Sequence, residues 1–453
     1  MLVASSLAAG SIAAPASGPP PSNAASNQSA SANPSPGACT SGEASALSEL
    51  SCEVVAKIGN PSGRILVAAL PLGTDRTLTA QAAVGLSERL ATAVAARFGA
   101  RTRVVPAPSL SAARALAQGE SRVVLVAGTL ASGELRVTAD SYPVSGGFWD
   151  RVRGVPSSPT AHARAVRSID AEIAALLPPV RLATGTVDKV PASGDVVALA
   201  CGDVTGNGET TLVVVGRHRV ALGRLAAGRF VTVAESPWTN LSPVSPTPLR
   251  EPIGAAVIRP GPFVDVGLTD RQSGLRLNAR LGVVATLGAP VPIFGAGCLG
   301  RAGLGIGRGA PCTSDDKPRV DLRDVSDVDA VAGTIAVERD GTWRSIVATR
   351  ARDGVVTLRD DRGRTATLPD VGAELALGDL DLDGDPELVA SVNTPNPADD
   401  AVVVRTWSHD GALRERFRVP VPEGVRALAI CPPAGAGIRP VVVATANGFE
   451  VLR

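Results

Sequence analysis

The chain has 453 residues with 44 basic and 43 acidic side chains, so its formal net charge is +1. This balance excludes a strong electrostatic attraction to nucleic acid or anionic lipid, and an aromatic content of 3% argues against a platform for stacked bases. The length allows two or three domains with sizeable cores. No run of about 18 apolar residues occurs past the N-terminus, so we expect no integral membrane span.

The first 16 residues are apolar and small, and they end in Ala14-Pro15-Ala16, which is typical of a signal-peptidase site. The basic stretch that begins an export signal is missing, so residues 1–16 are interpreted as a truncated signal peptide. Residues 17–58 are predicted to be a Ser/Pro-rich disordered tether followed by a short amphipathic helix. The helix keeps four apolar residues on one face: Leu47, Leu50, Val54 and Ile58. We expect an exported protein, periplasmic or attached to the cell envelope, with secretion as the alternative.

Six cysteines fit an exported protein, because disulfides persist in oxidising compartments. Cys201 and Cys431 lie beside equivalent turns of a repeat described below, so they would be neighbours if the repeats close into a ring. Two local bridges are also predicted: Cys39 with Cys52, and Cys298 with Cys312.

Residues 59–182 are predicted to form an α/β sandwich, because buried strands alternate with helical periodicity. A hairpin is expected around Ser132-Gly133, and Ser158-Pro159 is expected to cap a last helix. That helix would turn four apolar residues inward: Val166, Ile169, Ile173 and Leu176. The earlier elements are expected at these positions: strands at 64–71 and 103–105, and helices at 86–98 and 111–118.

Three short motifs in this region resemble the N-terminal α/β domain of TolB-like and FlgO-like bacterial envelope proteins. They are Leu70-Pro71 at the end of the first strand, Arg103-Val104-Val105, and Phe148-Trp149. The resemblance covers about a quarter of the chain, and it implies a binding and scaffolding module without catalytic residues.

Residues 183–453 consist of short predicted strands separated by Gly, Pro and Asp turns. The strand units recur at roughly 40–60 residues, the size of a four-stranded propeller blade, and no crossover helices separate them. We therefore predict an all-β propeller of six or seven blades after the α/β domain. The expected units lie near 197–222, 253–278, 331–358, 373–408 and 427–453, with a weaker one at 280–306.

The sharpest motif runs from Asp379 to Glu387. Carboxylates at alternate positions followed by glycine can surround a hard cation with oxygen ligands. The predicted ligands of a structural Ca²⁺ are the side chains of Asp379, Asp381, Asp383 and Glu387 with the carbonyl of Asp385. The alternative is an Asp-rich turn that bonds its own backbone, although four acids at this spacing would repel one another without a cation.

The same frame recurs at 203–211 with less charge, and ligand charge sets calcium affinity. This loop is predicted to bind calcium weakly, or to imitate the metal cage with side-chain hydrogen bonds. Its ligands would be Asp203, Thr205, Asn207, Glu209 and Thr211. A third copy at 432–440 has no ligand side chains and is predicted to bind no metal.

The D-x-D-x-D-G-x-x-E-L pattern of 379–388 resembles the FG-GAP or VCBS repeats, which are the blades of integrin-α-like β-propellers. The match is good at 379–388, fair at 203–212 and very weak at 432–441. The resemblance implies a propeller in which Ca²⁺ is bound between the first two strands of a blade.

Signals for catalysis are scarce. Gly295 to Gly300 spells G-x-G-x-x-G, but the glycines that follow leave no helix for a dinucleotide site, so the segment is interpreted as a loop between blades. His162, His218 and His409 have no partner at catalytic or metal spacing and are interpreted as surface residues. No hydrolase elbow, zincin or P-loop motif occurs.

We therefore expect no catalytic residues and no cofactor other than calcium. The predicted function is that of an exported, non-enzymatic envelope scaffold, monomeric, that binds an envelope protein or glycan. Two alternatives remain: a hydrolase or lyase that acts on polysaccharide in the central funnel of the propeller, and a cell-surface adhesin.

Overall fold

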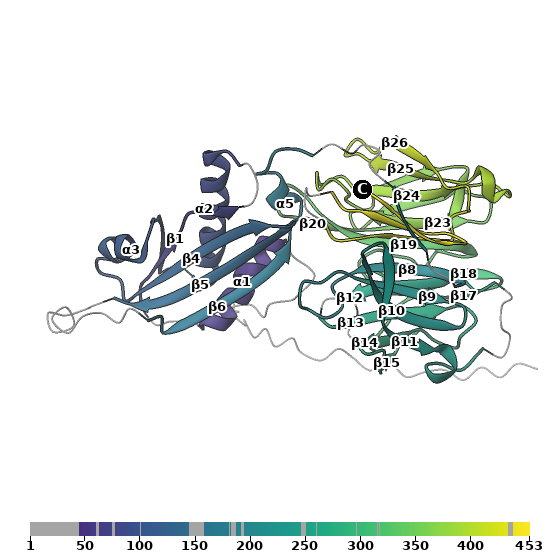
Figure 1. Ribbon diagram of the computed structural model, residues 1–453, viewed down its shortest axis with the longest axis horizontal. Helices are drawn as coiled ribbons and strands as arrows, with labels where there is room; N and C mark the ends of the chain where they lie inside the picture. Colours follow the sequence, from purple (N-terminus) through teal and green to yellow (C-terminus); the bar gives the residue numbers. More distant parts are fainter. Residues whose placement is uncertain are drawn as a thin grey trace, which may run out of the picture. The chain divides into compact units, whose positions relative to one another are not determined.

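The computed structural model describes these residues: 45–59, 63–74, 78–99, 101–144, 158–180, 182, 187–191, 194–245, 251–259, 261–295, 297–314, 316, 318–433 and 438–453 (Figure 1). The predictions for the signal peptide, the tether, Cys39 and Phe148-Trp149 lie outside them. In this described part of the chain, no helix is long and apolar enough to cross a membrane.

The first described elements form a mixed sheet in the order β3-β1-β4-β5-β6, with β2 beside β4 (Figure 1). β1 is parallel to β3 and β4, whereas β5 and β6 continue the sheet antiparallel. Parallel neighbours require a crossover, and α2 and α3 provide it. The strands are β1 (Ile65–Ala69), β2 (Gly73–Thr74), β3 (Thr102–Pro106), β4 (Arg122–Ala131), β5 (Glu134–Pro143) and β6 (Ala161–Ser168). The helices are α1 (Ala46–Ile58), α2 (Ala80–Phe98), α3 (Leu110–Leu116) and α5 (Ala171–Ala174).

Of two sequence predictions for this sheet, the hairpin is confirmed and the last helix is wrong. The hairpin around Ser132-Gly133 is confirmed, since β4 and β5 pair along their whole length. The predicted last helix is wrong, because residues 161–168 form β6 and only Ala171–Ala174 is helical. Within β6, Ala163 and Ala165 are buried while their neighbours face solvent, which is the two-residue alternation of a strand.

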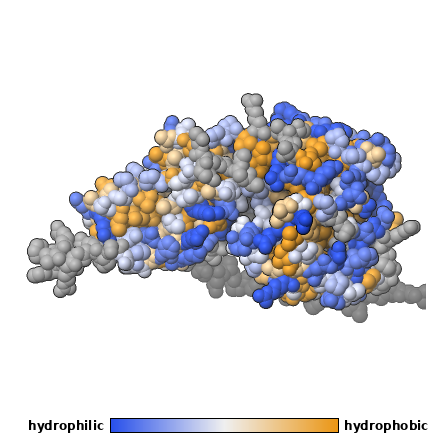
Figure 2. Space-filling view, in the orientation of Figure 1, coloured by the Kyte–Doolittle hydropathy of each residue, from blue (hydrophilic) through white to orange (hydrophobic). Residues whose placement is uncertain are grey.

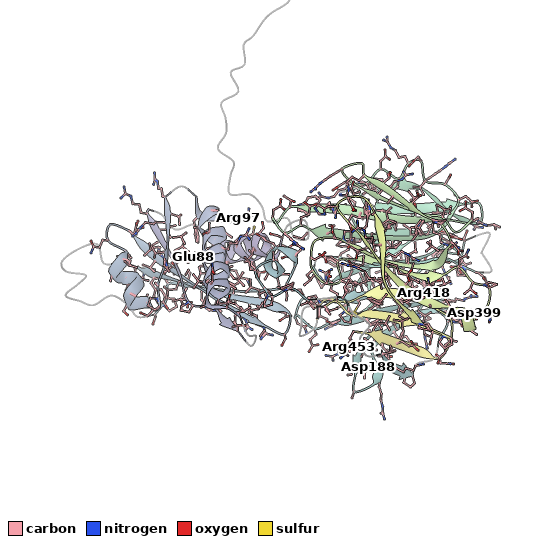
Figure 3. All side chains as sticks on the ribbon, turned by 90° about the horizontal axis from the view of Figure 1, so that it is seen from above. Glu88, Arg97, Asp188, Asp399, Arg418 and Arg453 are labelled. Carbon is pink, nitrogen blue, oxygen red and sulfur yellow. A yellow bond between two sulfur atoms is a disulfide. The ribbon has the colours of Figure 1, made fainter. Side chains whose placement is uncertain are left out.

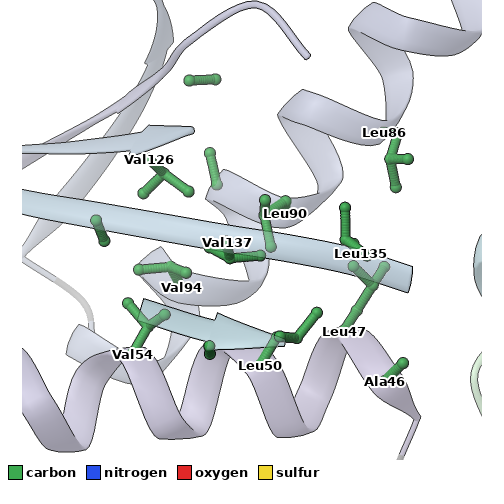
Figure 4. Packing of buried hydrophobic residues seen from close by; sticks show 14 of the residues in the cluster. Ala46, Leu47, Leu50, Val54, Leu86, Leu90, Val94, Val126, Leu135 and Val137 are labelled. Atoms are coloured by element: carbon green, nitrogen blue, oxygen red, sulfur yellow. The ribbon is translucent and has the colours of Figure 1, made fainter. Parts of the chain in front are cut away.

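Helices α1 and α2 bury their apolar stripes against one face of this sheet, as Figure 4 shows. Leu50 of α1 and Leu90 of α2 lie in the same cluster as Val137 of β5. Helix α3 covers the opposite face, where Ala113 packs with Leu66 and Val123. The sheet is therefore buried on both sides, and α1 forms over the residues whose spacing predicts it.

Replacement of Leu50 by alanine tests this packing. Leu50 is fully buried in the cluster, so Leu50→Ala is expected to lower the free energy of unfolding by about 2–5 kcal/mol through lost burial and a residual cavity. The matched control is Leu116→Ala on α3, a leucine that is 45% exposed. Urea denaturation measures both; equal losses in the two variants would contradict the described core.

The remaining strands form a propeller-like arrangement of sheets (Figure 1). Successive innermost strands contact one another, and β27 returns to β8. Four sheets have four strands: β8 (Val196–Gly202), β9 (Thr211–Gly216), β10 (Arg219–Ala226) and β11 (Arg229–Pro237); β12 (Gly254–Arg259), β13 (Phe263–Leu268), β14 (Leu275–Asn278) and β15 (Val283–Thr286); β23 (Val371–Gly378), β24 (Glu387–Val392), β25 (Ala401–Trp407) and β26 (Leu413–Pro420); and β27 (Ala427–Ile430), β28 (Val441–Ala444), β29 (Gly448–Leu452) and β7 (Val187–Pro191).

The number of separate blade-like sheets differs from the prediction of six or seven. Four four-stranded sheets form, and the strands between them join into one seven-stranded sheet. The junction is a single residue pair, Ile306 of β18 with Val328 of β19. That sheet contains β16 (Val291–Ile293), β17 (Gly297–Ala302), β18 (Gly305–Ala310), β19 (Val328–Val337), β20 (Trp343–Ala351), β21 (Val356–Asp360) and β22 (Thr365–Leu368). Two short 3₁₀ turns lie at η1 (Trp238–Asn240) and η2 (Pro397–Asp399).

The ring is closed by the pairing of its first and last strands and by the Cys201–Cys431 disulfide. Strand β7, which comes first in this part of the chain, pairs antiparallel with β29, which comes last. Arg453 also approaches Asp188 of β7, with 3.4 Å between Nη2 and Oδ2 (Figure 3). The predicted staple between Cys201 and Cys431 is confirmed as a disulfide across 230 residues of sequence. The local bridge between Cys298 and Cys312 is confirmed as well.

The G-x-G-x-x-G segment enters a strand. Residues Gly297–Ala302 form β17, which pairs with β16 and β18, so the interpretation as a loop between blades is wrong. Glycine suits this strand because a neighbouring backbone lies very close: an added Cβ at Gly297 would meet the carbonyl oxygen of Ala310 at 2.6 Å. No helix opens at the third glycine, as a dinucleotide site requires.

Candidate metal centre and central channel

The 379–387 loop joins the first two strands of a four-stranded sheet. β23 ends at Gly378 and β24 begins at Glu387, and these two residues face each other in the ladder. Between them the backbone takes positive φ at Leu382 (58°) and Gly384 (92°). Gly384 adopts this conformation without strain, so the chain curls and brings its acidic side chains toward one point.

Three carboxylates meet at that point. Asp379, Asp381 and Glu387 each offer an oxygen, and these oxygens lie within 4.8 Å of one another. Asp379 is 3% exposed and Glu387 is fully buried. Oxygen ligands of this kind are those that Ca²⁺ and Mg²⁺ prefer.

The loop backbone orients two of these three acids. Asp379 accepts hydrogen bonds from the amides of Asp383 (3.0 Å) and Gly384 (2.9 Å). Glu387 accepts from the Leu380 amide at 2.6 Å and from the Thr406 hydroxyl at 2.8 Å. Asp381 Oδ1 is buried and has no hydrogen-bond partner among the described residues. The cluster therefore contains a buried carboxylate oxygen without a hydrogen-bond donor among the described residues.

The electrostatic cost of this cluster appears in its pKa values. Burial raises the pKa of Asp379 to about 7, against the attraction of Arg439. Burial and the charge of Asp383 raise the pKa of Asp381 to about 6. Burial, with Asp379 and Asp381 beside it, raises the pKa of Glu387 well above its usual range. A bound cation would offset this repulsion and hold all three groups ionised.

The side chains of Asp383 and Asp385 lie outside this group of three. Asp383 Oδ1 accepts from the Asp385 amide at 2.8 Å, and the Asp383 carbonyl accepts from Arg339 Nε at 2.7 Å. Asp385 Oδ1 lies 2.6 Å from Nδ1 of His409. The structure thus brings together three of the four predicted side-chain ligands, whereas Asp383 bonds the loop backbone.

The 203–211 loop satisfies its own polar groups. Asp203 accepts from the amides of Thr205 (2.9 Å), Gly206 (2.7 Å) and Gly208 (2.7 Å). Asn207 Oδ1 accepts from the Thr205 hydroxyl at 2.6 Å and from the Glu209 amide at 2.9 Å. These bonds correspond to the predicted alternative in which side chains imitate the metal cage. Thr211 is the first residue of β9, and the side chain of Glu209 pairs with Arg224 at 2.5 Å.

The two loops are expected to respond differently to substitution. Asp203→Ala removes the acceptor of three backbone amides, so it should lower stability by about 1–3 kcal/mol whether or not calcium is present. Asp381→Ala should abolish calcium binding and leave the calcium-free protein no less stable. Calorimetric calcium titration and thermal denaturation measure both effects. Loss of calcium binding in Asp203→Ala, with retention in Asp381→Ala, would reverse this assignment.

The 432–440 turn contacts the 379–387 loop. The Arg439 amide donates to the Leu380 carbonyl at 2.8 Å, and the positive charge of Arg439 acts on Asp379. This turn, whose residues 434–437 lie outside the described part, therefore supplies the 379–387 loop with a cation and a backbone bond.

A cavity of about 590 Å³ runs between the innermost strands β8, β12, β16, β19, β23 and β27. Sequence reasoning missed its two acidic strand residues, Asp329 of β19 and Glu374 of β23. The sequence signal that could have identified them is a single acidic residue within an otherwise apolar strand. The other charged lining residues are Arg217, Glu251, Arg426 and Arg439.

The histidines lie on the surface, as predicted, but two of them have acidic partners. His162 is in β6, and its Nδ1 lies 2.6 Å from Asp140 Oδ1. His409 pairs with Asp385 as described above. His218 is exposed. Neither pair is joined by a described serine or cysteine nucleophile, because all described cysteines are disulfide-bonded and no serine bonds to either ring.

No family model matches the chain, and no curated protein matches it. Among solved structures, TolB from Acinetobacter baumannii is 13% identical, with a TM-score of 0.28 over 87% of this chain and 94% of that one. The C-terminal domain of LpoB from Salmonella enterica is 14% identical, with a TM-score of 0.20 over 27% of this chain and 95% of that one. AofleA from Arthrobotrys oligospora is 10% identical, with a TM-score of 0.31 over 73% and 83%. These scores are too low to support functional conclusions, so the proposals below rest on the residues of this chain.

Proposed function

We propose that this chain is an exported, non-enzymatic envelope protein whose calcium-braced propeller is a scaffold for binding another macromolecule. In this proposal the 379–387 loop is a calcium loop of the FG-GAP or VCBS type. The observation that carries it is the group of Asp379, Asp381 and Glu387, whose ligand oxygens lie within 4.8 Å. Since the loop backbone and Thr406 already hold Asp379 and Glu387, the ion would brace a turn rather than activate a substrate.

The disulfides support export. The Cys201–Cys431 and Cys298–Cys312 bridges, together with a disulfide at Cys52, leave no described cysteine free. Such bridges persist in the periplasm or outside the cell and are reduced in the cytosol.

The closed ring supports the scaffold role. Pairing of β7 with β29 and the Cys201–Cys431 bridge fix the sheets relative to their neighbours, and a preorganised surface loses little entropy on binding. The face seen in Figure 2 intersperses hydrophilic and hydrophobic residues, as binding surfaces of non-obligate complexes do. We propose an envelope protein or glycan as the partner and a monomer as the working state.

Affinity capture from envelope extract tests this proposal. The wild-type chain is used as bait with calcium or with a chelator, beside Asp381→Ala and the control Glu415→Gln on β26. We expect one partner to be enriched by the wild type and by Glu415→Gln in calcium, and to be lost with the chelator and with Asp381→Ala. If the chelator and Asp381→Ala leave the enrichment of the partner unchanged, the proposed role of calcium is contradicted. If no protein or glycan is enriched, the scaffold role is contradicted.

A polysaccharide hydrolase or lyase is the second candidate, because Asp329 and Glu374 line the central cavity. Glycoside hydrolysis uses two acids in different protonation states, and burial raises the pKa of Glu374 to about 8. Release of reducing ends from a panel of envelope polysaccharides by the wild type, and its loss in Glu374→Gln, would favour this candidate. Equal release by both proteins, or none, excludes it.

A further inference from the structure

The acidic side of the central cavity has fewer cations than anions. Glu374 lines the cavity, and its carboxylate forms no ion pair or hydrogen bond with any described side chain; only its backbone amide is bonded, to Ser391 Oγ at 3.1 Å. Asp329 lines the same cavity, and its Oδ1 is buried without a hydrogen-bond partner in the described part of the chain. Among the described residues, no donor therefore satisfies the Glu374 carboxylate, and one buried oxygen of Asp329 also has none.

Arg350, the described arginine that acts on Glu374, already has other partners. Arg350 bonds Asp329 Oδ2 at 2.5 Å, the Val371 carbonyl at 2.7 Å and the Asn393 side chain at 3.4 Å. Asp400 adds a further negative charge nearby, and its oxygens are held by backbone amides. Glu374 therefore experiences two acids, Asp400 and Asp329, and one arginine.

The lining arginines Arg217, Arg426 and Arg439 are not among the charges that act most strongly on Glu374. Glu374 is partly accessible from the cavity, yet protein surrounds it so closely that burial raises its pKa to about 8. The lining of the cavity includes small and aliphatic side chains, among them Ala373 and Leu375 on β23 and Ala330 on β19. A ligand that adds one positive charge on a slender aliphatic chain would satisfy both the charge and the shape.

We propose that the central cavity binds an organic cation, an ammonium group on an aliphatic chain, with Glu374 as its acceptor and Asp329 as a neighbouring negative charge. The ammonium donates to Glu374, which ionises on binding, and the chain lies against the alanine and leucine walls. A cavity of about 590 Å³ is within the range of small-molecule sites. The same group could belong to a free amine or to a lysine side chain of a partner, and the experiment separates these sources.

The test uses the full-length chain and three probes with the same five-carbon chain: pentylamine, pentanol and pentanoate. Isothermal titration calorimetry is expected to show binding of pentylamine that is stronger than that of pentanol and pentanoate by about tenfold or more. N-acetyl-lysine amide is the fourth probe. Binding of this probe as tight as that of pentylamine assigns the site to a lysine side chain, and weaker binding assigns it to a free amine; both agree with the proposal.

Glu374→Gln is the decisive variant, with Glu415→Gln, an exposed acid of β26, as its control. Because burial disfavours the charged form of Glu374, the glutamine variant should fold at least as stably as the wild type. We expect it to bind pentylamine about tenfold more weakly or worse, while Glu415→Gln binds as the wild type does. The proposal is overturned if pentanoate binds as well as the amine, if Glu374→Gln leaves amine binding intact, or if no probe binds at millimolar concentration.

Discussion

Removal of the ring staple is expected to cause the largest loss of stability in this chain. The double variant Cys201→Ser/Cys431→Ser opens a loop of 230 residues, and chain entropy assigns about 5 kcal/mol to a closure of that length. Equilibrium urea unfolding of the oxidised protein measures the loss. Ring closure by β7 and β29 should persist, so the variant should still fold, with a lower midpoint.

The local bridge is the matched control. Cys298→Ser/Cys312→Ser opens a separation of 14 residues, which corresponds to about 3 kcal/mol. Both double variants remove one disulfide and add two hydroxyls, so their difference reports loop length and position. If the ring variant lost no more than the local variant, the bridge between the first and last sheets would not be the main staple of the ring.

The acid cluster is expected to make stability fall with rising pH in the absence of calcium, and calcium is expected to remove this fall. Without divalent cations, the free energy of unfolding should fall as pH rises from about 4 to about 7, because burial raises the pKa of Asp379 from 3.8 to about 7. In that window the folded chain retains a proton that the unfolded chain has released, so rising pH favours unfolding. Asp379 alone corresponds to about 4 kcal/mol.

Calcium should remove this loss, since the bound ion holds the carboxylates ionised. At about 100 times its dissociation constant, it adds about 3 kcal/mol to the folded state. Asp379→Asn should flatten the calcium-free pH profile and abolish the calcium effect, whereas Glu415→Gln should leave both unchanged. Chemical denaturation at pH 4, 5.5 and 7 measures these differences. Identical pH profiles for the wild type and Asp379→Asn in a chelator would show that Asp379 does not lower the free energy of unfolding as pH rises.

Local patterns predicted the elements whose periodicity is decided by near neighbours. The apolar spacing of Leu47, Leu50 and Val54 predicts α1, and the flanking runs around Ser132-Gly133 predict the β4–β5 hairpin. The prediction failed at 161–168, where three alanines alternate with His162, Arg164 and Val166. Alanine and arginine favour a helix by intrinsic propensity, but pairing with β5 places them in a strand, and propensity is too weak to resist a full ladder of hydrogen bonds.

The candidate metal site was predictable because its ligands lie within nine residues of sequence. Spacing alone identified Asp379, Asp381 and Glu387, and it could not show that Asp383 and Asp385 face Arg339 and His409. Those partners come from β19–β20 and β25–β26, so their approach depends on the packing of sheets. The isolated acids Asp329 and Glu374 were missed for the same reason: they share a cavity only because β19 and β23 are neighbours in the ring.

By itself, the sequence determined the repeat of short strands, the curled acidic turn and the pairing of cysteines beside equivalent turns. These follow from side-chain chemistry and spacing within a few tens of residues. Only the tertiary structure decided that the middle strands join in one seven-stranded sheet, that the 203–211 loop satisfies its own amides, and that Glu374 and Asp329 line a common channel. Each of these depends on contacts between residues far apart in the chain, whose free energy is set by burial and by the partners that packing brings within reach.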